Sequence, residues 1–570
     1  MTDVADISAD SESEIRHPKF RAARPPWYLV TPVVICAAGV ALPLVYLGVR
    51  ALDADAAGLR EVLLRWRNLA LLGNTLLLTL GVLLATVAMA LPAAWLTVRT
   101  DLPGRRFFTL ALVLPLAIPG YLMAYALLAV GGQYGAAAQL LGVELPRLSG
   151  YWGALVALSF YNFPYMLLNL RAALNGLDPG MEEVAQSLGH RPMSVFFRVI
   201  VPQLRPALVA GGLIVALHVL GDFAVVSLLG YETFSYALYL EYKTSAYVTS
   251  YAAWLALMML TLAGMYVAIE LGVLRGLRLH RAGAGMARRR RMARLGGWRW
   301  PAAGGLVLLL LAAVGVPVTT ISYWATQANY TFLQHDLWDA VMDSLWAATP
   351  AAVLATLLAM PVAYLARRYP GKRSTGLERL SYLGYATPSL AFAMGLLVVG
   401  LYLLPDAAYQ WLYHLPTPAY GLEMLGVGLS EAWYDRLDRA LPLVLIYALG
   451  LHFLAEAVGP IRSSLYQATP RLEEASRSLG HGQIATFFRV TLPLLRPGLV
   501  VSLALVFLSV MKELPLTFLL SPLGFGTLAT NLWSYTEEAM FAEAAPFALL
   551  ILLLAAMFVG VLLANEGRKN

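Results

Sequence analysis

Charged residues and cysteine are both scarce in this sequence of 570 residues. Asp, Glu, Lys and Arg make up 13% of it, whereas they make up about a quarter of an average soluble domain. Apolar residues make up 59%, so the charges are too few to cover a water-soluble surface, and a lipid bilayer is the solvent that the composition indicates. The only cysteine, Cys36, excludes a disulfide framework, a thiolate zinc site and a CxxC redox motif.

Long apolar runs are the main feature that is present. Twelve of them have the roughly 20 residues that an α-helix needs to cross about 30 Å of hydrocarbon. They lie near 27–49, 68–98, 107–130, 151–170, 207–230, 250–274, 301–324, 343–366, 380–404, 440–460, 498–520 and 544–564. The sequence therefore predicts an all-α integral membrane protein with twelve transmembrane helices in two sets of six. The first run is too long for a signal peptide, and we interpret it as an uncleaved anchor.

Lys and Arg are distributed unevenly over the loops between these spans. With a cytoplasmic N-terminus, 32 of the 41 basic residues fall on the cytoplasmic side, where positive charge is retained. Both termini are therefore predicted to be cytoplasmic. Four arginines at 288–291 are interpreted as a topological anchor at anionic lipid, and no nucleic-acid partner is expected. The predicted segments are a tail (1–26), a six-helix domain (27–274), a basic linker (275–300), a second six-helix domain (301–564) and a C-terminal tail (565–570).

An internal repeat relates the two halves. Residues 182–206 and 473–497 match at a constant offset of 291, with 14 of 25 positions identical. Each half has an even number of predicted spans, so both copies enter the bilayer in the same direction. The halves are then expected to be parallel and related by an axis along the membrane normal. The interface between them is the natural place for a substrate pathway.

Each copy of the repeat lies in a long loop, and we name residues 178–206 and 469–497 the first and second repeat loops. Asp178-Pro and Thr469-Pro are typical of a helix start, and a Gly eleven residues later suits a left-handed helix end. Paired phenylalanines predict a second short helix, before Pro202 or Pro493 redirects the chain. An amphipathic helix on lipid headgroups is one interpretation, but paired glutamates favour docking in the groove of a soluble partner.

The repeat loops resemble the coupling loops of ABC importer permeases. That family has Glu-Ala-Ala, three residues, Gly and a hydrophobic stretch that ends in Leu-Pro, and similar patterns occur here at 183–202 and 474–493. The resemblance covers essentially the whole chain and implies a type I importer permease with two six-helix repeats. It assigns ATPase coupling to Glu182, Glu183, Ala185, Gly189, Arg198, Pro202, Glu473, Glu474, Ala475, Gly480, Arg489 and Pro493. Segments 114–121, 221–229 and 512–529 are similar to ferric-iron importer permeases, with thiamine and phosphonate permeases as alternatives.

The sequence contains no phosphate-binding loop of the form GxxxxGK[ST]. The nearest segment, 371–374, lacks the upstream Gly and the Ser or Thr directly after Lys. We therefore expect no cofactor on this chain. ATP and Mg²⁺ are expected on a separate cytoplasmic ATPase. This ATPase is expected to be a homodimer, because one permease chain offers two loops for docking. The resemblance also implies a periplasmic substrate-binding protein and the bacterial inner membrane. Without HExxH, GxSxG or a nucleophile with a paired base, the chain is not predicted to be an enzyme.

Two acids inside spans are the candidates for the substrate pathway. Asp222 corresponds to Glu513 at the offset of 291, each 16 residues after the proline that begins its span, or about 24 Å from the cytoplasmic end. His218 and Lys512 lie beside them. Intramembrane ionisable groups are functional candidates by default, so we expect the two acids to face each other across the pseudo-twofold axis. Oxygen donors suit hard Fe³⁺, which makes Asp222 and Glu513 a candidate transient metal site; alternatively, Glu513 pairs with Lys512 or a neighbouring span.

Other polar groups carry weaker signals. His452 and Glu456 are one helical turn apart, but Tyr161 and Tyr165 occupy the equivalent positions, so symmetry does not support a metal pair. Tyrosines and acids in 231–251 and 535–543 are interpreted as an interfacial belt that meets the binding protein, with a metal relay as the alternative. An insertion that lies largely in 405–439 distinguishes the second half.

An ion-coupled secondary transporter is the leading alternative from another class, since it can also have twelve spans in two parallel halves. The paired repeat loops count against it, because a secondary carrier needs no ATPase dock.

Overall fold

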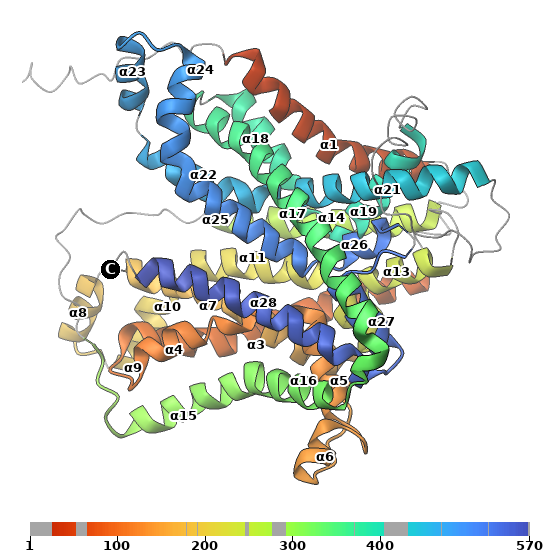
Figure 1. Cartoon of the computed structure of the whole chain (residues 1–570). Helices are drawn as coiled ribbons and strands as arrows, with labels where there is room; N and C mark the ends of the chain where they lie inside the picture. Colours follow the sequence, from red (N-terminus) through yellow and green to blue (C-terminus); the bar gives the residue numbers. More distant parts are fainter. Residues whose placement is uncertain are drawn as a thin grey trace, which may run out of the picture.

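The computed structural model describes residues 25–52, 65–177, 179–190, 192–244, 250–275, 292–369, 371–403, 431–468, 470–522 and 524–567. Apart from a β-bridge between Thr100 and Ala293, these residues form helices, turns and connecting segments (Figure 1). The prediction of an all-α protein is therefore confirmed.

Helices occupy nearly all of both halves. Those of the first half are α1 (Trp27–Leu52), α3 (Trp66–Arg99), α4 (Arg105–Ala111), α5 (Gly120–Val130), α6 (Ala136–Leu141), α7 (Gly150–Gly176), α8 (Pro179–Ser187), α9 (Pro192–Val195), α10 (Val201–Gln203), α11 (Arg205–Gly221), α12 (Ala224–Leu228), α13 (Phe234–Thr244) and α14 (Ser250–Arg275). Those of the second are α15 (Arg299–Leu310), α16 (Val316–Gln327), α17 (Tyr330–Arg368), α18 (Lys372–Ala386), α19 (Ser389–Leu403), α21 (Glu431–His452), α22 (Leu454–Gln467), α23 (Pro470–Ser478), α24 (Gln483–Thr486), α25 (Leu492–Met511), α26 (Pro515–Leu520), α27 (Leu528–Glu537) and α28 (Phe541–Gly567). Each of the twelve predicted spans falls on one or more of these helices.

Several spans are broken rather than continuous. Among the described residues, seven helices are long and apolar enough to cross a membrane alone, and three bent helix pairs reach that length and apolar character when each pair is counted together. The bends are 90° between α4 and α5, 57° between α10 and α11, and 48° between α21 and α22. Pro115 and Pro119 explain the first bend, because proline has no N–H for a helical hydrogen bond and its ring clashes with the preceding turn.

The first span of each half packs against the other half. In Figure 1, α1 lies with α17, α18 and α21, whereas α15 and α16 lie with α3 and α5. Gly39 allows α1 to approach α21 closely, since a Cβ there would clash with the Tyr447 hydroxyl. The indole N–H of Trp324 in α16 donates to the carbonyl oxygen of Ala129 at 3.0 Å. The two halves are therefore interlocked rather than placed side by side as separate blocks.

Both repeat loops have the predicted helix–break–helix form. Gly189 and Gly480 have φ of 85° and 87°, a left-handed conformation that glycine adopts without steric cost. Each second helix contains a π-helical turn, at Phe196–Ile200 and Phe487–Thr491. The predicted redirection at Pro493 is wrong, because the helix runs without a sharp bend from Gln483 to Met511. The wider π-turn before the proline shifts the hydrogen-bond register and so accommodates it.

Some predictions concern residues outside the described ranges. These are the tail up to residue 24, the helix-start residues Asp178 and Thr469, the arginines at 288–291 and most of the insertion 405–439. The side chain of Glu183 also lies outside them. The five-segment division of the chain stays a prediction.

Candidate functional site

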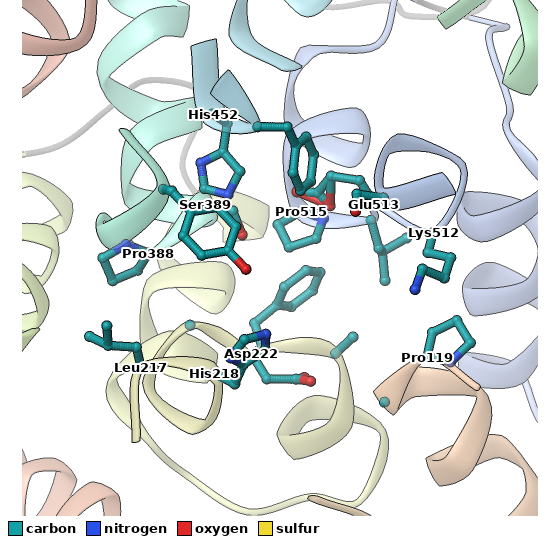
Figure 2. Close-up of a pocket in the computed structure, with 18 of the residues that line it drawn as sticks. Pro119, Leu217, His218, Asp222, Pro388, Ser389, His452, Lys512, Glu513 and Pro515 are labelled. Atoms are coloured by element: carbon teal, nitrogen blue, oxygen red, sulfur yellow. The ribbon is translucent and has the colours of Figure 1, made fainter. Parts of the chain in front are cut away.

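A cavity of about 250 Å³ lies between the two halves (Figure 2). Its walls come from helix breaks and junctions, namely α4–α5, α11–α12, α18–α19, α21–α22 and α25–α26, together with α7. The lining includes Tyr121, Tyr161, Tyr165, His218 and Asp222 from the first half, and Tyr385, His452, Glu456, Ser509, Lys512 and Glu513 from the second. The four residues predicted for the pathway, Asp222, Glu513, His218 and Lys512, therefore come together around one space.

Asp222 and Glu513 occupy equivalent positions at two helix breaks, directly after α11 and just after α25. Asp222 Oδ1 accepts a hydrogen bond from the backbone N–H of Val225 at 2.9 Å, and Glu513 Oε1 accepts one from Leu516 at 3.0 Å. Each acid thus satisfies an otherwise unpaired N–H at the start of the short helix that follows, α12 or α26. Capping is a structural role that the sequence interpretation did not include.

Lys512 joins the two halves across the cavity. Its ammonium donates to the carbonyl oxygen of Leu116 at 3.4 Å, in the helical turn Leu114–Ala117 of the first half. A positive charge near the carbonyl end of a helical turn is electrostatically favourable. Figure 2 shows Asp222 and Glu513 on opposite walls, with Lys512 extending toward Pro119.

The second half contributes a third acid, Glu456. The Ser509 hydroxyl donates to Glu456 Oε2 at 2.6 Å. His452, one turn earlier, is only 7% exposed. Among the described residues, His452 Nδ1 and the Tyr121 hydroxyl are buried without a hydrogen-bond partner. Such atoms are costly to bury unless a ligand or a water satisfies them, so both indicate a space that takes a polar guest.

The first half places aromatic hydroxyls where the second half has ionisable groups. Tyr161 and Tyr165 correspond to His452 and Glu456 at the offset of 291, and all four line the cavity. The ring of His218 lies 4.6 Å from the ring of Tyr165. His452 and Glu456 were not predicted to form a site, because the first half has tyrosines at the equivalent positions. The signal that identifies them is that polar residues of different types recur at equivalent positions inside the spans.

The acids and histidines in the described part of the cavity do not form a tight cluster. Within the part of the chain that the structure describes, no group of three or more His, Cys, Asp or Glu side chains is close enough to hold a metal ion. Asp222 and Glu513 use one oxygen each for capping. The remaining carboxylate and phenol oxygens are hard donors, the kind that hard cations prefer.

Two ion pairs, one buried and one partly exposed, attach the repeat loops to the neighbouring helices. Arg99, the last residue of α3, lies 3.0 Å from Glu182 in α8, and Arg368, the last residue of α17, lies 2.9 Å from Glu473 in α23. Arg368 and Glu473 are only 8% and 9% exposed. The Tyr364 hydroxyl also donates to Glu473, at 3.1 Å. The first glutamate of each predicted coupling pair is therefore an internal anchor.

The opposite face of each loop is exposed. Of the other predicted coupling residues, Gly189, Arg198, Glu474, Ala475, Gly480 and Arg489 are exposed, Pro202 and Pro493 are half-buried, and Ala185 is buried. Apolar side chains also project outward: Met181, Val184 and Leu188 from the first loop, and Leu472, Leu479 and Ile484 from the second. An apolar helix face without cover inside the chain is suited to the groove of a partner protein.

Two copies of one family signature span most of the chain. Residues 78–274 and 355–565 match the family described as binding-protein-dependent transport system inner membrane component. The chain belongs to this family: it is a multi-pass inner-membrane permease of an ABC importer, a transport protein rather than an enzyme. The matched regions begin inside α3 and α17, so they leave out α1, α15 and α16, the helices that cross to the other half.

Individual relatives share the fused, two-copy form or match a single copy. An Fe(3+)-transport system permease protein FbpB 2 of Haemophilus influenzae is 29% identical over 543 residues, covering 95% of this chain and 98% of that protein. A probable ABC transporter permease protein y4fN of Sinorhizobium fredii is 26% identical over 79% of this chain and 78% of its own. The molybdenum transport system permease protein ModB of Escherichia coli is 32% identical over 26% of this chain and 68% of its own.

Proposed function

We propose that this chain passes ferric iron across the inner membrane and that the cavity between its halves is the transport pathway. The observation that carries the proposal is the lining, which holds three carboxylic acids and four tyrosines but only one lysine. Carboxylate and phenol oxygens are the donors that hard cations prefer. A relative that matches 95% of this chain is named for Fe(3+) transport.

The same lining counts against an oxyanion as the substrate. Relatives named for sulfate and molybdenum transport match about a quarter of the chain, and a divalent oxyanion in this cavity would meet Asp222, Glu456 and Glu513 with only Lys512 to attract it. Like charges at short distance in a site of low dielectric repel strongly. Phosphonate is disfavoured for the same reason. Thiamine is a cation, which this lining does not repel, so the uptake assay below compares it with iron directly.

The energy source is proposed to be a separate cytoplasmic ATPase dimer, which holds ATP and Mg²⁺ and docks on the two repeat loops. The exposed apolar side chains of α8 and α23 support this, because they lie on the face opposite the anchoring ion pairs. Two docking loops in one polypeptide match the two subunits of a dimer, with one permease chain in each complex.

The repeat loops, and both termini, are proposed to face the cytoplasm. Lys and Arg are concentrated in the loops on the same side of the predicted spans as the repeat loops. Cytoplasmic loops retain positive charge, which supports this orientation. The opposite end of the molecule, with α6, α13 and α27 (Figure 1), then faces the periplasm, where a substrate-binding protein delivers the ion.

The test is uptake of radioactive iron into proteoliposomes that contain the permease, its ATPase and its binding protein. Asp222→Asn and Glu513→Gln keep an oxygen for capping but remove the negative charge, so iron uptake should fall to a small fraction of the wild-type rate while the complex still assembles. Glu144→Gln, which removes an exposed acid outside the cavity, is the control and should transport normally. ATP-driven uptake of sulfate, molybdate or thiamine by the wild-type protein, with no uptake of iron, would contradict the proposal.

A further inference from the structure

The positive charge of Lys512 breaks the symmetry of the cavity. Asp222 and Glu513 are equivalent at the offset of 291 residues, whereas the residue equivalent to Lys512 is Gly221. Gly221 and Lys512 both line the cavity, and no other Lys or Arg of the described residues belongs to the lining. The repeated architecture therefore does not require a base at this position, and the lysine has a role that belongs to the second half alone.

Only a weak contact holds the ammonium group of Lys512. An ammonium has three N–H donors, and in the described part of the chain one acceptor lies within hydrogen-bond distance, the carbonyl oxygen of Leu116. Nζ and that oxygen are 3.4 Å apart, longer than the usual separation of about 2.7–3.2 Å. The four-carbon stem of a lysine is flexible. The ammonium can therefore leave Leu116 at little cost and reorient within the cavity.

The acids of the lining lie on both sides of this group. Figure 2 shows the ammonium nitrogen between the wall that carries Asp222 and the wall that carries Glu513. Ser509, one helical turn before Lys512, donates to Glu456 Oε2 at 2.6 Å, and Glu456 interacts electrostatically with Lys512. The lysine is therefore the nearest source of positive charge for all three acids of the described lining.

A site that passes a cation must also release it. Carboxylates in surroundings of low dielectric attract a metal cation far more strongly than they do in water, and conduction requires binding that is weak enough for the ion to leave. A lysine offsets the charge of one ionised carboxylate, whichever of the acids bears it. When a metal cation enters, repulsion between the two positive charges weakens its binding.

We propose that Lys512 is a tethered competitor of the transported cation. Its ammonium partly neutralises the acids while the cavity is empty, lowers the affinity of the cavity for a metal cation and so speeds release. The inference rests on the proposed function in one respect, that the substrate is a cation. Lys512 supplies no ligand to the metal, because an ammonium has no acceptor lone pair, and it acts through its charge.

Luminescence of Tb³⁺ measures the effect on binding. Tb³⁺ is a hard trivalent cation, and hard cations prefer oxygen donors. Its emission rises when nearby tyrosines transfer excitation energy to it, and four tyrosines line the cavity. Tb³⁺ alone is titrated into the full-length permease in detergent. The part of the signal that is lost in the double variant Asp222→Asn, Glu513→Gln reports on the cavity.

Four variants separate the charge of Lys512 from its contact with Leu116. Lys512→Met removes both, whereas Lys512→Gln removes the charge and keeps an N–H donor. Both variants should bind Tb³⁺ in the cavity about tenfold more tightly than the wild type, or better. Lys512→Arg keeps the charge and should bind as the wild type does. Arg294→Met, which removes an exposed positive charge outside the cavity, is the control and should leave the affinity unchanged.

Uptake of radioactive iron distinguishes slow release from a damaged pathway. In proteoliposomes with the ATPase and the binding protein, Lys512→Met and Lys512→Gln should lower KM and the maximal rate together, because tighter binding in the ground state slows the later steps. A purely structural contact between Lys512 and Leu116 would instead lower the maximal rate without lowering KM.

The outcomes test the inference separately from the proposed function. Unchanged or weaker Tb³⁺ binding in Lys512→Gln would overturn the inference, even if Lys512→Met differs from the wild type, because the contact with Leu116 and not the charge would then matter. A Tb³⁺ signal that does not depend on Asp222 and Glu513 would also overturn it. If Lys512→Met fails to fold, Lys512→Gln and Lys512→Arg decide. Uptake of sulfate or molybdate and not of iron by the wild-type complex would contradict ferric-iron transport, while the Tb³⁺ affinities would still decide what the charge of Lys512 does.

Discussion

The buried ion pair between Arg368 and Glu473 allows a prediction with a defined magnitude. Its side chains are 8% and 9% exposed, and Glu473 also accepts hydrogen bonds from Tyr364 and Thr491, both at 3.1 Å. Arg368→Met keeps the unbranched, apolar stem but leaves the carboxylate buried without its counter-charge. Removing one partner of a buried pair costs about 3–5 kcal/mol, so we expect a loss of unfolding free energy of that size.

The equivalent pair in the first half should matter less. Glu182 is 21% exposed, and water can solvate part of its charge when Arg99 is replaced by Met. Trp95 and Ile200 stand where the second half has Tyr364 and Thr491, and neither offers a hydroxyl. We expect Arg99→Met to cost roughly half as much as Arg368→Met, because partial exposure reduces the penalty for an unpaired charge.

A double-mutant cycle measures the interaction directly. The unfolding free energies of Arg368→Met, Glu473→Gln and the double variant are compared by denaturant titration of the full-length permease in detergent. The double variant should be more stable than the sum of the single losses predicts, by about 0.5–3 kcal/mol. Additivity within about 0.5 kcal/mol would refute the interpretation of this contact as a stabilising anchor of the second repeat loop.

Three further predictions concern close approach and capping. Gly39→Leu should destabilise the protein by about 1–3 kcal/mol through overpacking, because a side chain at this position meets Tyr447. Gly48→Leu in the same helix is the control, since it has free space around it, and it should leave the melting temperature unchanged. Equal effects of the two substitutions would contradict the packing of α1 against the second half. Gly120→Ala places a Cβ 2.7 Å from Asp222 Oδ2, so it should displace that carboxylate and reduce iron uptake in proteoliposomes, and wild-type uptake would show that the carboxylate position is unimportant. Asp222→Ala should lose about 1 kcal/mol more stability than Asp222→Asn, because asparagine can still cap α12; identical unfolding free energies would exclude a capping role.

Much of the architecture was predictable because its signals are local in the sequence. A run of about 20 apolar residues indicates a membrane span regardless of which other helices pack against it. The offset of 291 between the repeat loops predicted that Asp222 and Glu513 are equivalent, and the structure places both at the same kind of helix break. The bends within spans were less predictable, since a proline is compatible with a kink, a break or a π-turn, as the helix through Pro493 illustrates.

The composition of the cavity was only partly predictable. Asp222, Glu513, His218 and Lys512 stood out because charge inside a span is rare. His452 and Glu456 were set aside because the first half has tyrosines at their positions, although all four side chains line the same cavity. Equivalence of position, rather than identity of residue type, is what the pseudo-symmetry preserves.

The sequence by itself determined the solvent, the positions of the apolar helices and the repeat with its two loops, because hydropathy and periodicity are properties of contiguous residues. Only the tertiary structure decided that α1 and α16 cross to the opposite halves, that Asp222 and Glu513 cap helices, and that Arg99 and Arg368 pair with glutamates of the repeat loops. These features depend on contacts between residues tens to hundreds of positions apart. Such contacts are selected by packing and by the need to satisfy buried polar groups, neither of which leaves a periodic trace along the chain.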